Sequence, residues 1–400
     1  MRKKRLKIAI FMVAHTIGGS QKRFANLYNY LRRNGNHDYY LFTNSYLYDK
    51  LVEMGLLGRR MGNVELLLTR NILNLTDRPG ADVRIFGNKR VRGMNIPRQV
   101  LQRFEFLIDK EKYSDVEFDV AHFVFAAHHR NTIRYKSLVL ECQSAGLEHD
   151  DWRKKHFRDL LAKAQRVNIA SERIKSILEG LSGTRDGNKY RVNPCSFIDY
   201  SRCALRDKEP WIVFCGSLIP NKNPLLFVDA VSHLRDMTGP SFKAFLLGTG
   251  SMEAEVKSRI RELELEGIVD TMFHPNPPEL LSHALIFASL QEFDNYHSQA
   301  LMEAMACGCA IVASDVGETW KLVDENVGLR VRLDAREIAD KMLSLLKNAG
   351  MAEKLGRNAR EKVMKEQRVD IFASYVERLY EEASSEAAGS TARSRHGIRT

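Results

Sequence analysis

The chain has 400 residues, of which 44% are hydrophobic and 28% are charged, a globular composition that excludes a small protein dependent on disulfide bonds. This length predicts two domains rather than a single core. The charge is uneven: residues 1–200 contain 36 Lys and Arg against 21 Asp and Glu, so residues 201–400 contain 25 against 29. The basic first half either attracts an acidic partner (membrane, lipid phosphate, acidic glycan or nucleic acid) or is a solvated surface.

The N-terminus superficially resembles a signal peptide, because residues 2–5 are basic and residues 6–14 are mostly apolar. Lys7 interrupts the apolar run, and no small-residue cleavage site follows, so the segment predicts a first buried strand in a cytoplasmic protein. No run approaches the roughly 18–20 apolar residues of a membrane span, which leaves only peripheral membrane contact. The six cysteines are scattered, as is typical of reduced, buried thiols, and no metal site is expected.

Residues 1–195 alternate apolar runs with amphipathic stretches, which predicts a parallel sheet covered by helices, a Rossmann-like domain. The expected strands and helices are, in chain order, strands 7–14, 39–43, 83–86, 120–125, 137–141 and 166–170, and helices 21–33, 97–109 and 152–164.

Residues 196–209 are polar and weakly periodic, which predicts a linker before a second Rossmann-like domain over 210–368. There the expected strands are 211–216, 242–247, 285–288 and 310–313, and the helices begin at 224, 252, 299, 335 and 352, with Asn223 capping the first. A final helix over 369–383 is expected to pack on a domain surface, with the possibility of crossing back to the first domain. Residues 384–400 predict a disordered tail.

Three glycine loops follow expected strands, where α/β proteins bind ligands. Gly18 and Gly19 lie before a helix whose N-terminus favours an anion. Ser217 and Lys222 lie after the strand at 211–216, and Gly248 and Gly250 follow the strand at 242–247. Each loop taken alone is equally consistent with a simple turn, and a lone lysine with a solvated one.

The segment from Glu292 to Gly308 is the most informative. A polar loop leads into a small-residue helix with Ser298 as its expected N-cap, so the amides of residues 298–300 can bind a diphosphate. Glu303 lies inside this apolar helix, where a carboxylate needs a partner. Either the hydroxyls of a ribose or a neighbouring lysine could be the partner of Glu303.

The stretch from Gln299 to Gly317 resembles the motif of GT-B glycosyltransferases, specifically glycosyltransferase family 4. The resemblance extends to residues 211–226, 242–250, 8–31 and 118–122, and covers nearly all of 7–382. It implies the GT-B fold, an α/β architecture with two facing Rossmann-like domains and a donor site in the interdomain cleft. It also implies a retaining transfer of sugar that needs no metal and no cofactor.

The resemblance assigns Lys222 to the donor phosphates, Glu303 to the ribose, Gly18 and Gly19 to a loop over the phosphates, and His122 to the acceptor side. Three positions depart from the family: Ser217 replaces an arginine, Asn295 beside Asp294 replaces the first glutamate of the Glu-x7-Glu motif, and Gln143 stands where a second histidine is expected. The expected catalytic residues are Lys222, His122 and Asn295. The expected donor-binding residues are Gly18, Gly19, Ser217, Gly248, Gly250, Asp294, Ser298, Gln299, Ala300 and Glu303, with the base near 248–252 and 274–279.

These residues predict an enzyme of cell-envelope polysaccharide biosynthesis, such as lipopolysaccharide synthesis, that moves a sugar from a nucleotide-diphosphate sugar to a glycan or lipid-linked acceptor. The basic first half allows peripheral contact with an anionic membrane at its inner face. A catalytically impaired partner subunit, motivated by Ser217 and Asn295, and a GT-B-fold nucleotide-sugar epimerase stay open. A Rossmann oxidoreductase is disfavoured because no G-x-G-x-x-G occurs, and a nucleic-acid binder because aromatic and basic residues are not interleaved.

Overall fold

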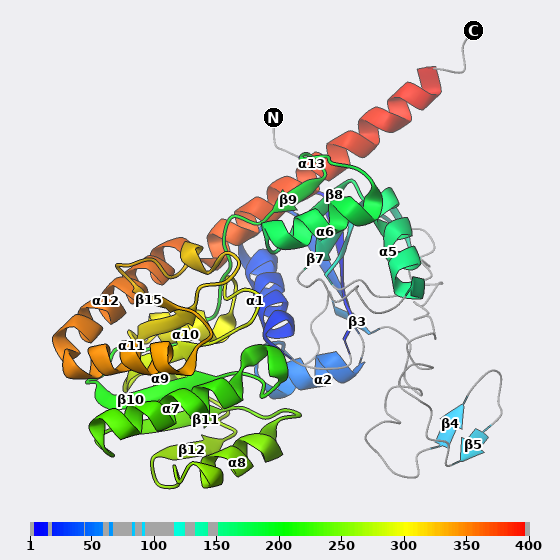
Figure 1. Ribbon diagram of the computed structural model, residues 1–400. Coiled ribbons are helices and arrows are strands. Elements are labelled where there is room, and N and C mark those ends of the chain that lie inside the picture. Colours follow the sequence, from blue (N-terminus) through cyan, green and yellow to red (C-terminus); the bar gives the residue numbers. More distant parts are fainter. Residues whose placement is uncertain are drawn as a thin grey trace. The chain divides into compact units, whose positions relative to one another are not determined.

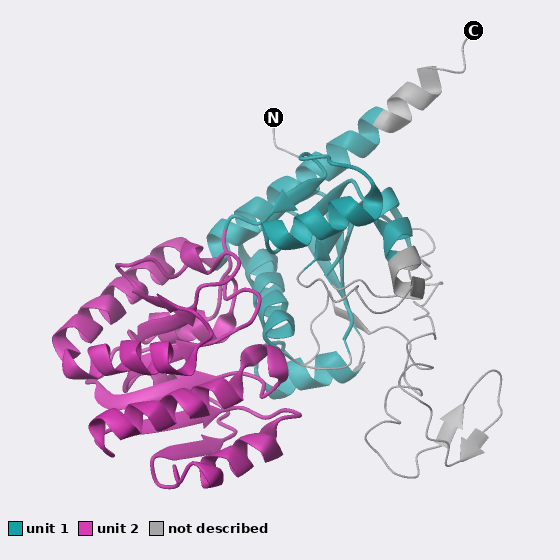
Figure 2. Cartoon of the chain, in the orientation of Figure 1, with its two compact units in different colours: residues 1–194, 369–400 teal, residues 195–368 magenta. Residues whose placement is uncertain are grey.

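The computed structural model describes residues 4–14, 18–43, 45–58, 64–66, 82–84, 90–92, 116–124, 133–142 and 151–396. The chain divides into two compact units (Figure 2). Unit 1 comprises residues 1–194 and 369–400, and unit 2 comprises residues 195–368. Each unit is built on one parallel sheet, as the alternation of apolar runs and helical patterns predicts. In the described part of the chain, no helix is both long and apolar enough to cross a membrane.

The sheet of unit 1 has the strand order β3-β2-β1-β6-β7-β8-β9, with every neighbouring pair parallel. β1 and β6 lie side by side at its centre, so the chain winds outward in both directions from this pair. Its strands are β1 (Lys7–Met12), β2 (Asp38–Thr43), β3 (Val64–Leu66), β6 (Glu117–Phe123), β7 (Arg134–Cys142), β8 (Arg166–Ile169) and β9 (Tyr190–Val192). The expected strand at 83–86 is instead part of a separate antiparallel hairpin of β4 (Asp82–Arg84) and β5 (Arg90–Arg92).

Helices cover both faces of this sheet (Figure 1). α5 (Asp151–Lys163) and α6 (Glu172–Ser182) bury apolar side chains in one core with Phe11 and Phe123, whose rings meet edge to face at 4.9 Å. Right-handed crossovers put α1 (Gly19–Asn34) and α2 (Ser45–Glu53) on the opposite face. The helix expected at 97–109 lies outside the described residues.

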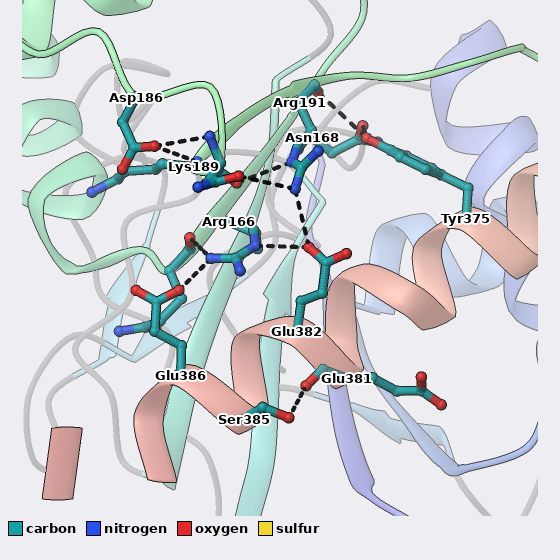
Figure 3. A network of polar contacts seen from close by, with 12 residues as sticks. Arg166, Asn168, Asp186, Lys189, Arg191, Tyr375, Glu381, Glu382, Ser385 and Glu386 are labelled. Carbon is teal, nitrogen blue, oxygen red and sulfur yellow. Dashed lines mark hydrogen bonds and ion pairs between the residues drawn. The ribbon is translucent and has the colours of Figure 1, made fainter. Parts of the chain in front are cut away.

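The C-terminal helix α13 (Val369–His396) follows unit 2 in the chain but packs on unit 1, against α1, β6 and β7. Arg166 on β8 pairs with Glu382 and Glu386 of this helix, and Tyr375 donates a hydrogen bond to Asn168 at 2.8 Å (Figure 3). These carboxylates raise the pKa of Arg166 against the opposing effect of its burial. The expectation of a disordered tail from residue 384 is wrong as far as His396, because α13 continues through it.

The sheet of unit 2 has the order β12-β11-β10-β13-β14-β15, again entirely parallel. Its strands are β10 (Glu209–Cys215), β11 (Lys243–Leu247), β12 (Val269–Met272), β13 (Ala284–Ser289), β14 (Ala310–Ser314) and β15 (Gly328–Val331). One face is covered by α7 (Pro224–Thr238), α8 (Glu253–Glu262) and α11 (Ala335–Lys347). The other face is covered by α9 (Pro277–Leu281), α10 (Gln299–Ala306) and α12 (Ala349–Glu366).

The segment 196–209, expected to be a linker, is part of the packed body of unit 2. Phe197 and Cys203 are buried, and a short 3-10 helix runs over Tyr200–Arg202. Tyr200 donates a hydrogen bond to the carbonyl of Gln367 at 2.6 Å, and the Gln367 side chain accepts one from the Ser196 amide at 2.7 Å. Its weak periodicity reflects irregular backbone that is fixed by specific hydrogen bonds rather than a free connection.

Candidate functional site

The sheet of unit 2 has its topological switch point between β10 and β13. β10 is flanked by β11 on one side and β13 on the other, so the loops after β10 and β13 leave the sheet at the same edge and diverge. In open α/β sheets such a divergence makes the crevice in which ligands bind. Lys222 and Gln291 come from these two loops, and the Lys222 ammonium donates a hydrogen bond to Gln291 Oε1.

Lys222 ends a 3-10 turn over Pro220–Lys222, and its side chain is half-buried. Backbone and side-chain bonds to the loop after β13 fix this turn: Glu292 N donates to Asn221 O at 3.0 Å, and Asn223 Nδ2 to Leu290 O at 2.9 Å. No Asp or Glu of the described residues forms an ion pair with Lys222, and burial lowers its pKa. Such a cation favours an anionic ligand, which would restore the solvation that it has lost.

Asn223 precedes α7 as expected, but its side chain does not cap the helix. Its backbone is left-handed, with φ of 55°, and its amide bridges to the loop after β13 instead. The residue therefore holds Lys222 in place.

Gly248 and Gly250 allow the loop after β11 to lie directly on the loop after β10. A Cβ at Gly248 would approach the Gly216 carbonyl oxygen to 1.9 Å, and one at Gly250 would approach that of Leu218 to 2.2 Å. Met252 N donates to Leu218 O at 3.0 Å, which fastens the two loops. Close packing of the two loops therefore explains both glycines without a ligand. Ser217, in the loop after β10, is exposed.

Asn295 is 0% exposed, and its amide is the centre of a polar cluster that joins the end of β13 to the end of β14 and the turn after it. Ser289 Oγ donates to Asn295 Oδ1 at 2.5 Å, and Asn295 Nδ2 donates to Ser314 Oγ at 2.9 Å and to Thr319 Oγ1 at 3.2 Å. These contacts occupy the amide within the protein, so the sugar contact expected of Asn295 would require the cluster to open. The cluster holds the loops after β13 and β14 together.

Replacing Asn295 with Ala is expected to lower the free energy of unfolding by about 3 kcal/mol, because buried hydroxyls of Ser289, Ser314 and Thr319 lose their shared partner. Urea unfolding followed by circular dichroism measures the loss. Ser298→Ala is the matched control on the same loop and should cost only about 1 kcal/mol as the loss of one N-cap. Equal losses for the two variants would contradict this account of Asn295.

Asp294 also holds two loops together. Its carboxylate accepts hydrogen bonds from Tyr296 N at 2.9 Å and from Glu318 N at 3.1 Å. Burial raises the pKa of Asp294 more than these two amides lower it. The side chain lies against Gly317, where a Cβ would come within 2.9 Å of the Asp294 Cγ atom. The structure therefore gives Asp294 a role in loop conformation, in addition to the donor contact expected of it.

α10 begins at Gln299 behind Ser298, whose hydroxyl accepts from Leu301 N at 3.4 Å, as expected of the N-cap. Its apolar residues are buried, and Glu303 is half-buried within it. At the other end, Lys208 donates to the Cys307 carbonyl at 2.7 Å, and Arg360 donates to that of Ala306. These two cations interact favourably with the negative end of the helix dipole, whose positive end lies at Gln299 and Ala300.

In unit 1, Gly18 directly precedes α1, and its amide donates to Gln21 Oε1 at 2.9 Å. Gly19 is the first residue of the helix. The loop after β1 therefore leads into a helix N-terminus, while residues 15–17 lie outside the described part.

His122 is 1% exposed, which argues against its expected contact with an acceptor. It lies on β6 beneath α13, where Nδ1 is 2.7 Å from the Tyr380 hydroxyl and Nε2 is 3.6 Å from Glu141. Glu141 also accepts from Asn168 at 2.8 Å. These contacts make His122 part of a buried network that anchors α13. Gln143, the position expected for a second histidine, is outside the described residues.

Sequence reasoning missed Gln291, Ser289, Ser314 and Thr319, which hold Lys222 and Asn295. Their signal in the sequence is position alone: Ser289 and Ser314 end β13 and β14, and Gln291 and Thr319 follow in the loops after these strands. Among the side chains that the structure describes, no cluster of three or more His, Cys, Asp or Glu is arranged to hold a metal ion.

Residues 201–362 match the family model described as "Glycosyl transferases group 1". Over most of its length the chain superposes on Anabaena Alr3699/HepE, solved with UDP and glucose (TM-score 0.68, 15% identity), and on TarM (TM-score 0.70, 14% identity). Each superposition covers 94% of this chain, and they cover 100% and 98% of the other two chains, respectively. With the two parallel-sheet units, these matches confirm the resemblance to GT-B glycosyltransferases.

Two curated relatives are enzymes of Campylobacter jejuni. The first, N-acetylgalactosamine-N,N'-diacetylbacillosaminyl-diphospho-undecaprenol 4-alpha-N-acetylgalactosaminyltransferase, is 33% identical over 134 residues, which is 33% of this chain. The second, GalNAc-alpha-(1->4)-GalNAc-alpha-(1->3)-diNAcBac-PP-undecaprenol alpha-1,4-N-acetyl-D-galactosaminyltransferase, is 26% identical over 178 residues, which is 44% of this chain. The chain spans 35% and 49% of the lengths of these two relatives.

Proposed function

We propose that the chain transfers a sugar, with retention of anomeric configuration, from a nucleotide-diphosphate sugar to a glycan or lipid-linked acceptor in cell-envelope biosynthesis. The observation that carries this proposal is Lys222, a half-buried ammonium at the switch point of unit 2 that has no carboxylate partner among the described residues. The named acceptors of the Campylobacter relatives support the lipid-linked class. The enzyme would need no metal, and the basic first half would favour peripheral contact with an anionic membrane from the cytoplasm.

Transfer develops negative charge on the leaving nucleoside diphosphate while the anomeric carbon becomes electron-deficient. Lys222 supplies a fixed positive charge in surroundings with little water, where it acts more strongly than in bulk solvent. The N-terminus of α10 adds the partial charge of its dipole, and Lys208 and Arg360 hold the opposite end of that helix. Glu303, half-buried on α10, is the proposed ribose ligand.

A thermal-shift panel of nucleoside diphosphates and nucleotide sugars, followed by a transfer assay with the stabilising donor, tests the proposal. A true donor raises the melting temperature by mass action. If no compound of the panel stabilises the protein, the assignment of the donor site is wrong.

A catalytically impaired partner subunit is the alternative that specific observations favour. Ser217 replaces a cation beside the phosphates, and Asn295 is committed to a buried cluster. Donor hydrolysis or transfer by the purified chain alone excludes this alternative. A product isomerised at the sugar without any acceptor would instead indicate an epimerase.

The dissociation constant of UDP is expected to rise with pH once the pH passes the lowered pKa of Lys222. Below that pKa the ammonium is charged and binding is at full strength, and above it the charge is lost. Calorimetric titration of wild type and Lys222→Arg between about pH 8 and 10.5 measures the effect as the difference between the two profiles, because the phosphates of UDP are fully ionised throughout and ionisation of its uracil is common to both.

The matched control is Lys222→Arg, whose guanidinium keeps its charge across this range, so UDP affinity should vary much less. The same pH profile in both proteins would show that another group is responsible.

A further inference from the structure

Trp320 is the most exposed tryptophan side chain that the structure describes, with 56% of its surface accessible. It lies in the 3-10 turn Thr319–Lys321 that follows β14. The Lys321 ammonium lies 5.8 Å from the centre of the Trp320 ring and 5.1 Å from that of Tyr296, and pairs with Glu318. The indole therefore has a cation within cation–π distance, while more than half of its surface is open to solvent.

The loop beside this turn also belongs to the candidate donor site. Tyr296 and the 47% exposed Phe293 belong to the loop after β13 that also carries Gln291, the partner of Lys222. The Asp294 carboxylate binds the Glu318 amide, which fixes that loop against the turn carrying Trp320. We call Phe293, Tyr296, Trp320 and Lys321 the aromatic platform. A ligand at the switch point would extend along these loops to reach it.

The charge around the aromatic platform disfavours an anionic ligand. Residues 290–298 and 315–322 carry four carboxylates and one lysine. Lys321 is already paired with Glu318, and Asp315 is paired with Arg330 at 2.6 Å. Lys321 and Arg330 are therefore already neutralised by Glu318 and Asp315, so neither offers a free charge to a phosphate group or an acidic membrane surface. A neutral ligand with polarised C–H groups suits the negatively charged face of an indole.

We propose that the aromatic platform binds a neutral sugar ring of the acceptor glycan, with Trp320 stacking on its C–H face. This inference rests on the proposed function. The strand order assigns the platform to the acceptor: Lys222 follows β10, the base is expected beyond β11 and β12, and Trp320 lies on the opposite side, after β14. The sugar attached to the diphosphate would then lie between Lys222 and the platform.

Saturation-transfer NMR of the full chain with methyl α-glycosides of glucose, galactose, N-acetylglucosamine and N-acetylgalactosamine, each in the presence of UDP, tests this assignment. At least one glycoside is expected to bind wild type. Trp320→Ala should weaken that binding about fivefold or more, whereas Trp320→Phe should keep most of it because the ring is retained. Met237→Ala, which removes a 42% exposed side chain elsewhere on unit 2, should leave it unchanged.

The thermal shift with UDP separates this inference from the proposed function. It should be the same in wild type and Trp320→Ala, and its absence from wild type would undermine the donor site instead. The assignment of the aromatic platform to a sugar ring is overturned if no glycoside binds wild type, or if wild type and Trp320→Ala bind it equally. Flotation with phosphatidylglycerol vesicles, or self-association, that disappears in Trp320→Ala would assign the surface to a membrane or to a second copy and overturn it as well.

Discussion

Lys222→Ala is expected to lower kcat/KM for sugar transfer about 100-fold or more, the loss typical of removing a preorganised charge from the site where transition-state charge develops. It should also remove most of the stabilisation by UDP. The physical reason is that Lys222 is held at the switch point by Gln291, is half-buried, and has no carboxylate of the described residues to neutralise it. Initial rates of transfer and the thermal shift with UDP measure the two effects.

Two variants separate the charge of Lys222 from its bulk and from general surface charge. Lys222→Arg restores a cation of different shape, and should recover part of the affinity for UDP but less of the rate. Lys257→Ala removes an exposed lysine of unit 2 that pairs with Glu253 on its own helix, and should leave both measurements unchanged. Rates within about threefold of wild type for Lys222→Ala would refute the assignment.

The sequence predicts the inner strands of both sheets because strands buried on both faces read as apolar runs, but it misses β12 and β15, the partly exposed edge strands of unit 2. β1, β2, β7 and β8 lie where those runs lie. β3 and β9 are three residues long, which is too short to carry a period, and neither is predicted. The prediction of a linker over 196–209 is wrong because the contacts that fix this segment are distant in the sequence. Gln367 binds Tyr200 and Ser196, which precede it by 167 and 171 residues.

The candidate site is predictable only as far as local chemistry reaches. A lysine after a strand points to Lys222, but nothing local identifies Gln291, 69 residues later, as its partner. Asn295 reads as a sugar ligand from the family pattern, whereas its burial depends on hydroxyls contributed by two other segments. The family pattern places His122 beside the acceptor. Nothing local in the sequence shows that Tyr380 on α13, 258 residues later, contacts His122.

Gly248→Ala is expected to lower the free energy of unfolding of unit 2 by at least about 3 kcal/mol more than Gly216→Ala. The two glycines have nearly the same φ, 154° and 156°, which L side chains rarely adopt. A Cβ at Gly248 would lie 1.9 Å from the Gly216 carbonyl oxygen, while one at Gly216 would meet nothing within 4 Å. The pair therefore shares an unfavourable positive φ and differs in the steric clash, which denaturant unfolding of the two variants compares.

The same pair of variants tests whether the glycine after β11 serves folding or the donor. If Gly248 serves the contact with the loop after β10, Gly248→Ala should lose UDP binding together with the fold, and lowering the temperature should recover both in parallel. Its neighbour Gly250, with a Cβ position 2.2 Å from the Leu218 carbonyl oxygen, should behave alike when changed to Ala. A folded Gly248→Ala protein of wild-type stability that fails to bind UDP would instead place the glycine against the nucleotide.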